Sequence, residues 1–505
     1  MSASTQKCSS KRARKNFSAA HDSGNPRLSS RLLILVMSLL MAASLQAQST
    51  ARKASYLPYE DARPIIQALG DIMPAELRAA SPAEIPAVWA RWIARRDAEI
   101  RSRLIQGDED SLVNLLLFGT SFTRRPRITS KALADAQGKS FQSYQTASPE
   151  MTALLAEIQS RADDLVQAMA APTQNERLLF ARRLAESKGY KLNNPPDRDR
   201  LKKYLLANLA RVLNEHASYS KILESARLLG DPSEEFAERS KLFRDRGLSS
   251  DTSLPPNFAL EKSLATMKAQ GLIAPASVRR VAIVGPGLDF TDKQDGYDFY
   301  PQQTIQPFAV IDTLMRLGLA RAGDFKLTTL DLSPRINDHL NNARMRAQRG
   351  AGYVVQLPRD PQWKPDLADY WARFGDKIGT PVAAAPVPAG INDVKVRAVQ
   401  IRPQVVTLIS SEDLNIVLQR LSLPPGESFD LMIATNILVY YDVFEQSLAL
   451  MNVEHMLRPG GFLLSNNALL ELPFSQVHSV GYETVVYSDK QSDGDHIVWY
   501  QRAAN

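Results

Sequence analysis

The sequence predicts an α/β fold with a mostly parallel sheet in its C-terminal half, preceded by an all-α domain. Two observations carry this prediction. From about residue 56 to 246 the apolar residues recur at helical spacing, with no clean two-residue alternation. After residue 257 short apolar runs alternate with helical segments, which is typical of a parallel sheet covered by helices on both faces.

Length and composition limit the classes of protein. A chain of 505 residues exceeds one ordinary core, so more than one domain is expected. Its content of 44% hydrophobic and 23% charged residues is typical of a globular protein. Part of the net charge of +7 lies in the first 31 residues, and the remaining charge is evenly mixed. We therefore expect no binding to nucleic acid.

The first residues have the layout of an export signal. A basic region ends at Arg31, an apolar run follows from 32 to 43, and Ala47 is a small residue suited to cleavage. That run has roughly a dozen residues, whereas about 20 are needed to span a bilayer. We predict that 1–47 is a signal peptide and that the mature protein is periplasmic or secreted, with no stable membrane span. The alternative is a wrongly assigned start and a cytoplasmic protein.

Metal and disulfide chemistry are not expected. The only cysteine, Cys8, would leave with the signal peptide. The 6 histidines are scattered without the spacing of metal ligands. We therefore predict no metal site.

Residues 52–246 are predicted to form the helical domain. A capping box at Ser81–Glu84 precedes Trp89 and Trp92, which begin an apolar stripe expected to face a core. Further helices are expected at about 150–169, 172–187, 197–213 and 232–245. The Ser/Pro-rich residues 247–257 are predicted to be a linker, and 258–505 to be the second domain.

Polar or glycine residues follow the predicted strands of the second domain. The strand at 280–284 runs into Gly285 and Gly287, the strand at 326–331 ends in Asp331, and the strand from 428 ends at Asn436. Parallel sheets bind ligands beyond the carboxyl ends of their strands, so we expect these residues to converge. Glycines let a ligand approach the backbone, and one carboxylate can accept both hydroxyls of a ribose.

The segment after Asn436 gives the most specific pattern. A capping box at Asp442 begins a helix, Arg458-Pro-Gly-Gly461 ends it, and a strand follows at 462–466. The Phe-Asp strand, asparagine tip and L-R-P-G-G-x-L resemble class I S-adenosylmethionine-dependent methyltransferases, over about 280–470. The stretch 436–441 is similar to R-N-V-L-I-Y-F of the chemotaxis-receptor methyltransferases. The terminal strands at 484–487 and 496–501 suit the antiparallel last strands of that fold, and the helical half resembles no family.

This resemblance implies a Rossmann-like fold and S-adenosylmethionine as cofactor. It implies that Gly285, Gly287, Asp331 and Asn436 bind the cofactor and that Asp413 meets adenine. Among the departures, Ile283 stands where the family has an acid, and Asp289 replaces the third glycine. Asp289 either substitutes for the missing carboxylate or marks a degenerate loop.

The catalytic candidates are Asn436, Tyr440 and Tyr441, because an aromatic ring near the sulfonium would stabilise its positive charge. No dedicated acid or base is required. The resemblance therefore implies methyl transfer to an acceptor that it does not identify, since an oxygen, nitrogen or carboxylate acceptor would each leave similar strands. The stretch similar to the chemotaxis-receptor methyltransferases favours a carboxylate or oxygen on a small molecule or a protein.

Two other functions remain open. Since S-adenosylmethionine is made in the cytoplasm, the export signal favours a non-catalytic binding or scaffold protein that retains the methyltransferase fold. A nicotinamide-dependent oxidoreductase shares the glycine turn and the ribose carboxylate, but it leaves Asn436 and the Pro-Gly-Gly segment unexplained. The aromatic loop 290–306 is expected to be either a lid or a packed surface loop.

Overall fold

The computed structural model describes residues 54–129, 132–133, 149–229, 243, 246–291, 297–389, 391, 394–466, 468–490 and 493–504. Residues 53–505 form one compact unit. The predicted signal peptide 1–47 and most of the helix predicted at 232–245 lie outside the described residues. No helix in the described part of the chain is both long and apolar enough to cross a membrane.

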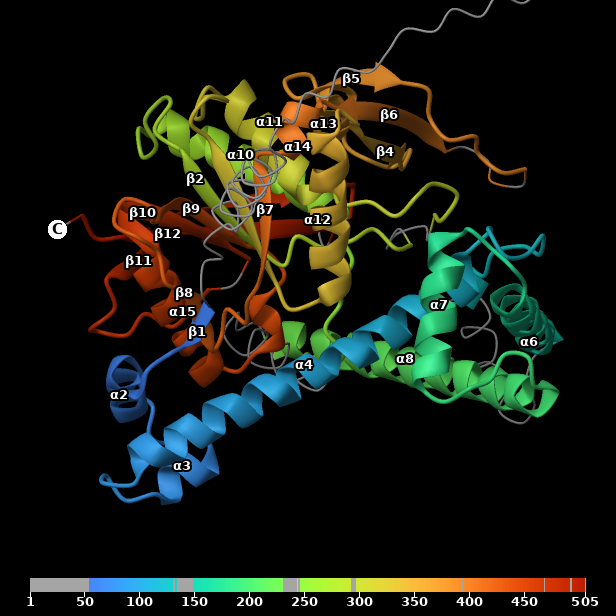
Figure 1. Cartoon of the computed structure of the whole chain (residues 1–505), viewed down its shortest axis with the longest axis horizontal. Coiled ribbons are helices and arrows are strands. Elements are labelled where there is room, and N and C mark those ends of the chain that lie inside the picture. Colours follow the sequence, from blue (N-terminus) through green and yellow to red (C-terminus); the bar gives the residue numbers. More distant parts are fainter. Residues whose placement is uncertain are drawn as a thin grey trace, which may run out of the picture. The chain divides into compact units, whose positions relative to one another are not determined.

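The C-terminal half contains a seven-stranded, mostly parallel sheet in the order β11-β12-β10-β9-β2-β3-β7, so the predicted Rossmann-like α/β fold is confirmed (Figure 1). β12 is antiparallel to both of its neighbours, β10 and β11. The chain goes outward from β2 to β3 and β7, then crosses to β9 on the other side of β2. The strands are β2 (Arg280–Val284), β3 (Lys326–Asp331), β7 (Ile409–Asp413), β9 (Phe429–Ala434), β10 (Leu457–Ser465), β11 (Val477–Val486) and β12 (Gly494–Arg502).

Alternate residues of the buried strands face two hydrophobic layers. In β2, Val281 and Ile283 pack in one layer and Ala282 and Val284 in the other, which explains why the strand is apolar throughout. The first layer is covered by α10 (Pro255–Ala269), α11 (Gln306–Arg316) and α12 (Pro334–Gln348). The second is covered by α15 (Val443–Met456), α2 (Tyr59–Ala68) and the first half of α4 (Ile85–Phe118).

The N-terminal half is helical as predicted, apart from one short strand. β1 (Ala54–Tyr56) pairs with β8 (Gln419–Leu421) of the C-terminal half; three residues are too few to show alternation in the sequence. The second half of α4 packs on three helices in a separate cluster, and Figure 1 shows α4 reaching from the sheet to them. The remaining helices are α3 (Ala75–Ala79), α6 (Pro149–Ala170), α7 (Glu176–Ser187) and α8 (Pro195–Leu229).

Two insertions decorate the sheet. One contains a three-stranded antiparallel sheet in the order β4-β6-β5. The other is the aromatic loop before α11, whose Phe290 and Tyr300 are buried and whose Asp298 accepts hydrogen bonds from Thr120 and Ser121. The described part of this loop is therefore packed rather than a lid. The elements of the first insertion are β4 (Tyr353–Arg359), α13 (Pro365–Arg373), β5 (Gly379–Val382), β6 (Lys395–Ile401) and α14 (Pro403–Val406).

Candidate functional site

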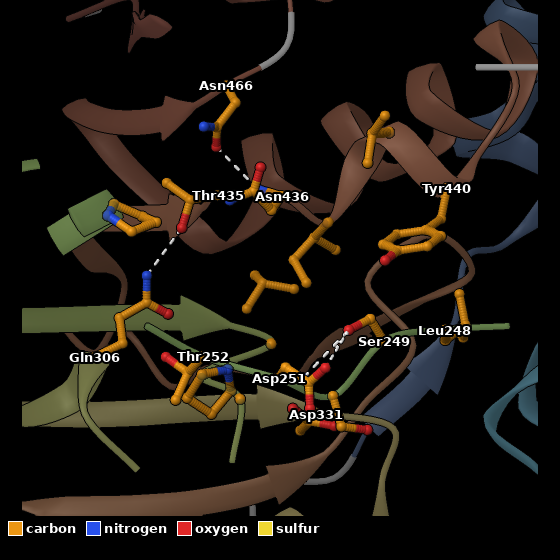
Figure 2. A pocket seen from close by; sticks show the side chains of 18 of the residues that line it. Leu248, Ser249, Asp251, Thr252, Gln306, Asp331, Thr435, Asn436, Tyr440 and Asn466 are labelled. Atoms are coloured by element: carbon orange, nitrogen blue, oxygen red, sulfur yellow. Dashed lines mark hydrogen bonds between the residues drawn. The ribbon is translucent and has the colours of Figure 1, made fainter. Parts of the chain in front are cut away.

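A cavity of about 450 Å³ lies at the carboxyl ends of β2, β3, β9 and β10 (Figure 2). This is the place where the strand order reverses, and parallel α/β sheets bind ligands there. The cavity brings together most of the residues singled out in the sequence: Gly285, Gly287, Asp331, Asn436, Tyr440 and Tyr441. It does not include Asp289 or Asp413.

The glycine turn after β2 is shaped by the protein itself. Gly285 and Gly287 have φ of 64° and 73°, which only glycine adopts without strain. A Cβ at 285 would lie 2.2 Å from Ile437 Cδ1, and a Cβ at 287 would lie 2.7 Å from Thr252 Cβ. The turn therefore needs glycine because neighbouring segments of the chain pack against it, and not only to admit a ligand.

Asp331 ends β3 at the wall of the cavity and is 8% exposed. Its Oδ1 accepts a hydrogen bond from the Ser333 amide at 2.7 Å. Burial raises the pKa of this carboxyl from 3.8 to about 7, and hydrogen bonds from the following amides only partly offset that effect. A ligand that donates hydrogen bonds from two hydroxyls to Asp331 would stabilise the charged form of its carboxyl.

Asn436 lies at the tip of β9 with φ of 58°, a left-handed conformation that asparagine tolerates better than most residues. Its backbone N–H donates to Asn466 Oδ1 at 2.8 Å, at the end of β10. Beside it, Thr435 Oγ1 accepts from Gln306 Nε2 at 2.9 Å. Figure 2 shows these side chains converging from β9, β10 and the N-terminus of α11, which therefore also faces the cavity.

A chain of hydrogen bonds continues from β10 to the turn between β11 and β12. Asn466 Nδ2 donates to Asp495 Oδ1 at 2.7 Å, and the Tyr487 hydroxyl donates to Asp495 Oδ2 at 2.5 Å. Burial and the charge of Asp495 raise the pKa of Tyr487, so its hydroxyl stays protonated. Asp493, in the same turn, also lines the cavity.

The two tyrosines play different parts. Tyr440 packs edge-on against Phe243 at 5.3 Å, and Figure 2 shows its hydroxyl directed toward the middle of the cavity. Tyr441 is only 3% exposed, and burial raises its pKa. Of the two, Tyr440 presents its polar end to a ligand.

The structure does not bring Asp289 and Asp413 to the cavity. Asp289 is buried, and its Oδ2 accepts hydrogen bonds from the Tyr300 hydroxyl and Gln303 Nε2. It holds the aromatic loop in place rather than facing the glycine turn. The Asp413 side chain is 56% exposed and pairs with Arg101 of α4 at 2.7 Å. Apolar side chains line the cavity near these strand ends instead: Leu332, Leu414 and Ile416.

Part of the cavity wall comes from residues outside the Rossmann-like pattern. Residues 248–253, called the strap below, lie across the glycine turn, where the Leu288 amide donates to Ser250 O at 2.6 Å. Arg103 of α4 anchors the neighbouring wall, since it donates to the carbonyl oxygens of Phe243, Arg246 and Tyr440 at 2.9, 3.0 and 3.2 Å. The sequence showed no signal for this wall, because its Ser/Pro-rich composition is that of a linker.

The charges at the cavity are of one sign. Asp251 of the strap, Asp331 of β3 and Asp493 of the β11–β12 turn line it. Among the described lining residues there is no lysine, arginine or histidine. The site therefore attracts a positively charged ligand and repels an anionic one.

No protein-family model and no curated protein matches this chain. Its fold is similar to N-methyltransferase NodS from Bradyrhizobium japonicum WM9, with 13% identity over 48% of this chain and 96% of the other and a TM-score of 0.24. It is also similar to magnesium protoporphyrin IX methyltransferase from Synechocystis PCC 6803, with 11% identity over 49% and 79% of the chains and a TM-score of 0.24. The glycopeptide N-methyltransferase MtfA follows, with 10% identity over 49% and 73% and a TM-score of 0.19. Values this low establish no function.

Proposed function

We propose that the protein transfers a methyl group from S-adenosylmethionine to an acceptor. The observation that carries this proposal is the convergence of Gly285, Gly287, Asp331 and Asn436 on one cavity. These are the positions that match the methyltransferase motifs in the sequence. S-adenosylmethionine supplies an electrophilic methyl group on a positively charged sulfur.

The cavity fits this cofactor in charge and in size. A volume of about 450 Å³ is in the range of a single small-molecule site. Asp331 would accept the ribose hydroxyls, and Leu332, Leu414 and Ile416 offer an apolar slot for a base. The N-terminus of α11 at Gln306 suits a carboxylate, because unpaired helix amides point there. The protein's own contribution would be to hold the two reactants in line.

A dinucleotide is a poorer fit. Its pyrophosphate is anionic, and the described residues of the cavity offer carboxylates and no basic side chain to meet it. The sheet also differs from the six-stranded dinucleotide fold, since an antiparallel β12 lies between β10 and β11. That inserted strand is the one expected from the resemblance to methyltransferases.

The finer points remain proposals. The likeness of 436–441 to chemotaxis-receptor methyltransferases favours a carboxylate or oxygen acceptor. The carboxylates that line the cavity instead favour a positively charged acceptor. Export of the mature chain and cleavage after Ala47 stay predictions. The convergence of Gly285, Asp331 and Asn436 supports a site for S-adenosylmethionine, and we propose a transferase because a scaffold has no need of that cofactor.

The test is calorimetry of the full chain with S-adenosylmethionine and with S-adenosylhomocysteine. Asp331→Ala removes a buried acceptor of charge-assisted hydrogen bonds and should weaken binding by about 1.5–3 kcal/mol, roughly 10- to 150-fold. Asp413→Ala is the matched control, because Asp413 ends the neighbouring strand outside the cavity, and its affinity should stay within about twofold. No binding to the parent at millimolar ligand, or equal losses in the two variants, would refute the proposed site.

A further inference from the structure

We propose that the methyl acceptor is a small amine that approaches as its ammonium ion. This inference rests on the proposed function and names the substrate class of the same cavity. The evidence is the placement of its carboxylates relative to the sheet, together with the aromatic side chains beside them.

The order of strands divides the cavity into two sides. Asp331, at the end of β3, and the apolar residues that follow β7 lie on one side of the glycine turn. Asn436, Asn466 and the turn between β11 and β12 lie on the other, because β9, β10 and β12 are neighbours in the sheet. If the ribose binds Asp331, the acceptor side is the one beyond Asn436.

Asp493 is the ionisable group suited to an ammonium on that side. Tyr487 donates its hydroxyl to Asp495, and Asn466 uses its amide nitrogen on the same carboxylate. Asp495 is therefore engaged by protein donors. Asp493 lines the cavity from the same turn, and none of the described lining residues is a lysine, arginine or histidine.

The charge of Asp493 decides between acceptor classes. At an effective dielectric constant of about 20, unit charges about 6 Å apart change an affinity on the order of a hundredfold, and solvent around the partly exposed Asp493 reduces this to about tenfold. Attraction of an ammonium and repulsion of a carboxylate act in opposite directions, so the discrimination between the two is larger still. Tyr440 and Phe243 add aromatic surface, which accepts both cations and apolar groups.

Size limits the acceptor as well. A volume of about 450 Å³ is that of a single small-molecule site, so an acceptor that shares it with S-adenosylmethionine must be a small molecule or the end of a larger one. The bound ammonium loses a proton to water before reaction. The nitrogen lone pair then forms the N–C bond, and the C–S bond breaks with its electron pair retained on sulfur. The positive charge passes from sulfur to nitrogen, so the products are the methylated ammonium ion and neutral S-adenosylhomocysteine.

The experiment measures binding to the complex of the full chain with S-adenosylhomocysteine. Amines and carboxylates with the same body are titrated in pairs, such as butylamine with pentanoate and 2-phenylethylamine with 3-phenylpropanoate. Each amine should bind at least tenfold more tightly than its paired carboxylate. Asp493→Asn should reduce the affinity for amines about tenfold and leave that for S-adenosylhomocysteine within about twofold. Asp489→Asn, an exposed residue of the same turn, is the matched control and should change neither.

The outcomes separate this inference from the proposed function. Absence of S-adenosylhomocysteine binding refutes both. If S-adenosylhomocysteine binds but a carboxylate binds as tightly as its paired amine, or no amine binds, the amine inference alone is overturned. The same holds if Asp493→Asn and Asp489→Asn behave alike. Transfer of a labelled methyl group to the bound amines, rising with pH as the nitrogen loses its proton, would confirm it.

Discussion

The helical half and the Rossmann-like half reach the same cavity by different routes. In the Rossmann-like half β2, β3 and β9 each run into a short motif, and these motifs lie at the cavity because the strand order places them there. In the helical half Leu104 and Phe243 line the cavity without any motif of their own. Their place depends on how α4 packs across the sheet, which is a property of the fold and not of a local pattern.

This difference bears on the predicted domain boundary. Trp89 and Trp92 of α4 share a hydrophobic layer with Met432 of β9 and Phe444 of α15. Gly107 of α4 lies so close to the strap that a Cβ there would be 1.9 Å from Leu248 O. The linker at 247–257 stays a prediction, and these contacts are the ones that would have to break if the halves separated there.

The largest expected effect comes from Trp92→Ala. Trp92 is 3% exposed, with its ring centroid 5.1 Å from that of Trp89 and 5.9 Å from that of Phe444. Removing it should cost about 3–5 kcal/mol of unfolding free energy, as for other buried tryptophans. Urea unfolding followed by circular dichroism and by fluorescence should shift as one transition. Tyr482→Ala, at a 66% exposed aromatic, should change stability by less than about 0.5 kcal/mol.

Two resolved transitions, of which Trp92→Ala moves only one, would favour the independent domains predicted from the sequence. The two halves would then be independent domains joined by a linker. A single transition would instead make the helical half part of the core that supports the site.

The next effect concerns Asp331 and the dependence of stability on pH. Its pKa is about 7 in the folded protein and 3.8 ordinarily, so the folded state holds the proton more tightly. Stability should therefore fall as pH rises from about 4 to 7, by up to about 1.4 kcal/mol per pH unit, and level off above 7. Asp331→Asn removes this loss and should be more stable than the parent at pH 8, on the order of 2–4 kcal/mol.

Denaturant unfolding of parent and variant at pH 5 and pH 8 measures that difference. Parallel pH profiles would show that Asp331 is not desolvated in the free protein. The variant should nevertheless bind S-adenosylhomocysteine more weakly, because a neutral amide replaces the carboxylate. A gain in stability with a loss of affinity is the pattern expected of a functional residue.

The sequence predicted β2 and β3 to the residue, including their ends at Val284 and Asp331. It did so because buried parallel strands are continuous apolar runs bounded by turn residues. By contrast, β10 begins at Leu457 and β11 at Val477, before the predicted starts at 462 and 484. Asp289 and Asp413 were assigned to the site by alignment with a motif, and their side chains are instead engaged by Tyr300 and Arg101. Side-chain partners that are distant in the sequence leave no local pattern. The contact of the strap with the glycine turn was missed because it too joins residues that are distant in the sequence, and the strap itself has the composition of a linker.

The smallest expected effect tests the wall that the helical half supplies. Arg103→Met removes the hydrogen bonds to Phe243, Arg246 and Tyr440 but keeps most of the side-chain bulk. The strap keeps the backbone hydrogen bonds from Leu248 to Arg103 O and from Leu288 to Ser250 O. We therefore expect only a partial loosening, with an affinity for S-adenosylhomocysteine about three- to tenfold weaker, or about 0.6–1.4 kcal/mol.

The matched control is Arg95→Met on the same helix, where the side chain is 52% exposed and pairs with Glu76 away from the cavity. Calorimetry should leave its affinity unchanged. Both variants remove one positive charge from α4. A difference in affinity between them therefore reports the hydrogen bonds of Arg103 to Tyr440 and Phe243, and not the lower charge of the helix. Equal affinities would mean that the Rossmann-like half forms the site alone and that the helical half stabilises the fold without shaping the cavity.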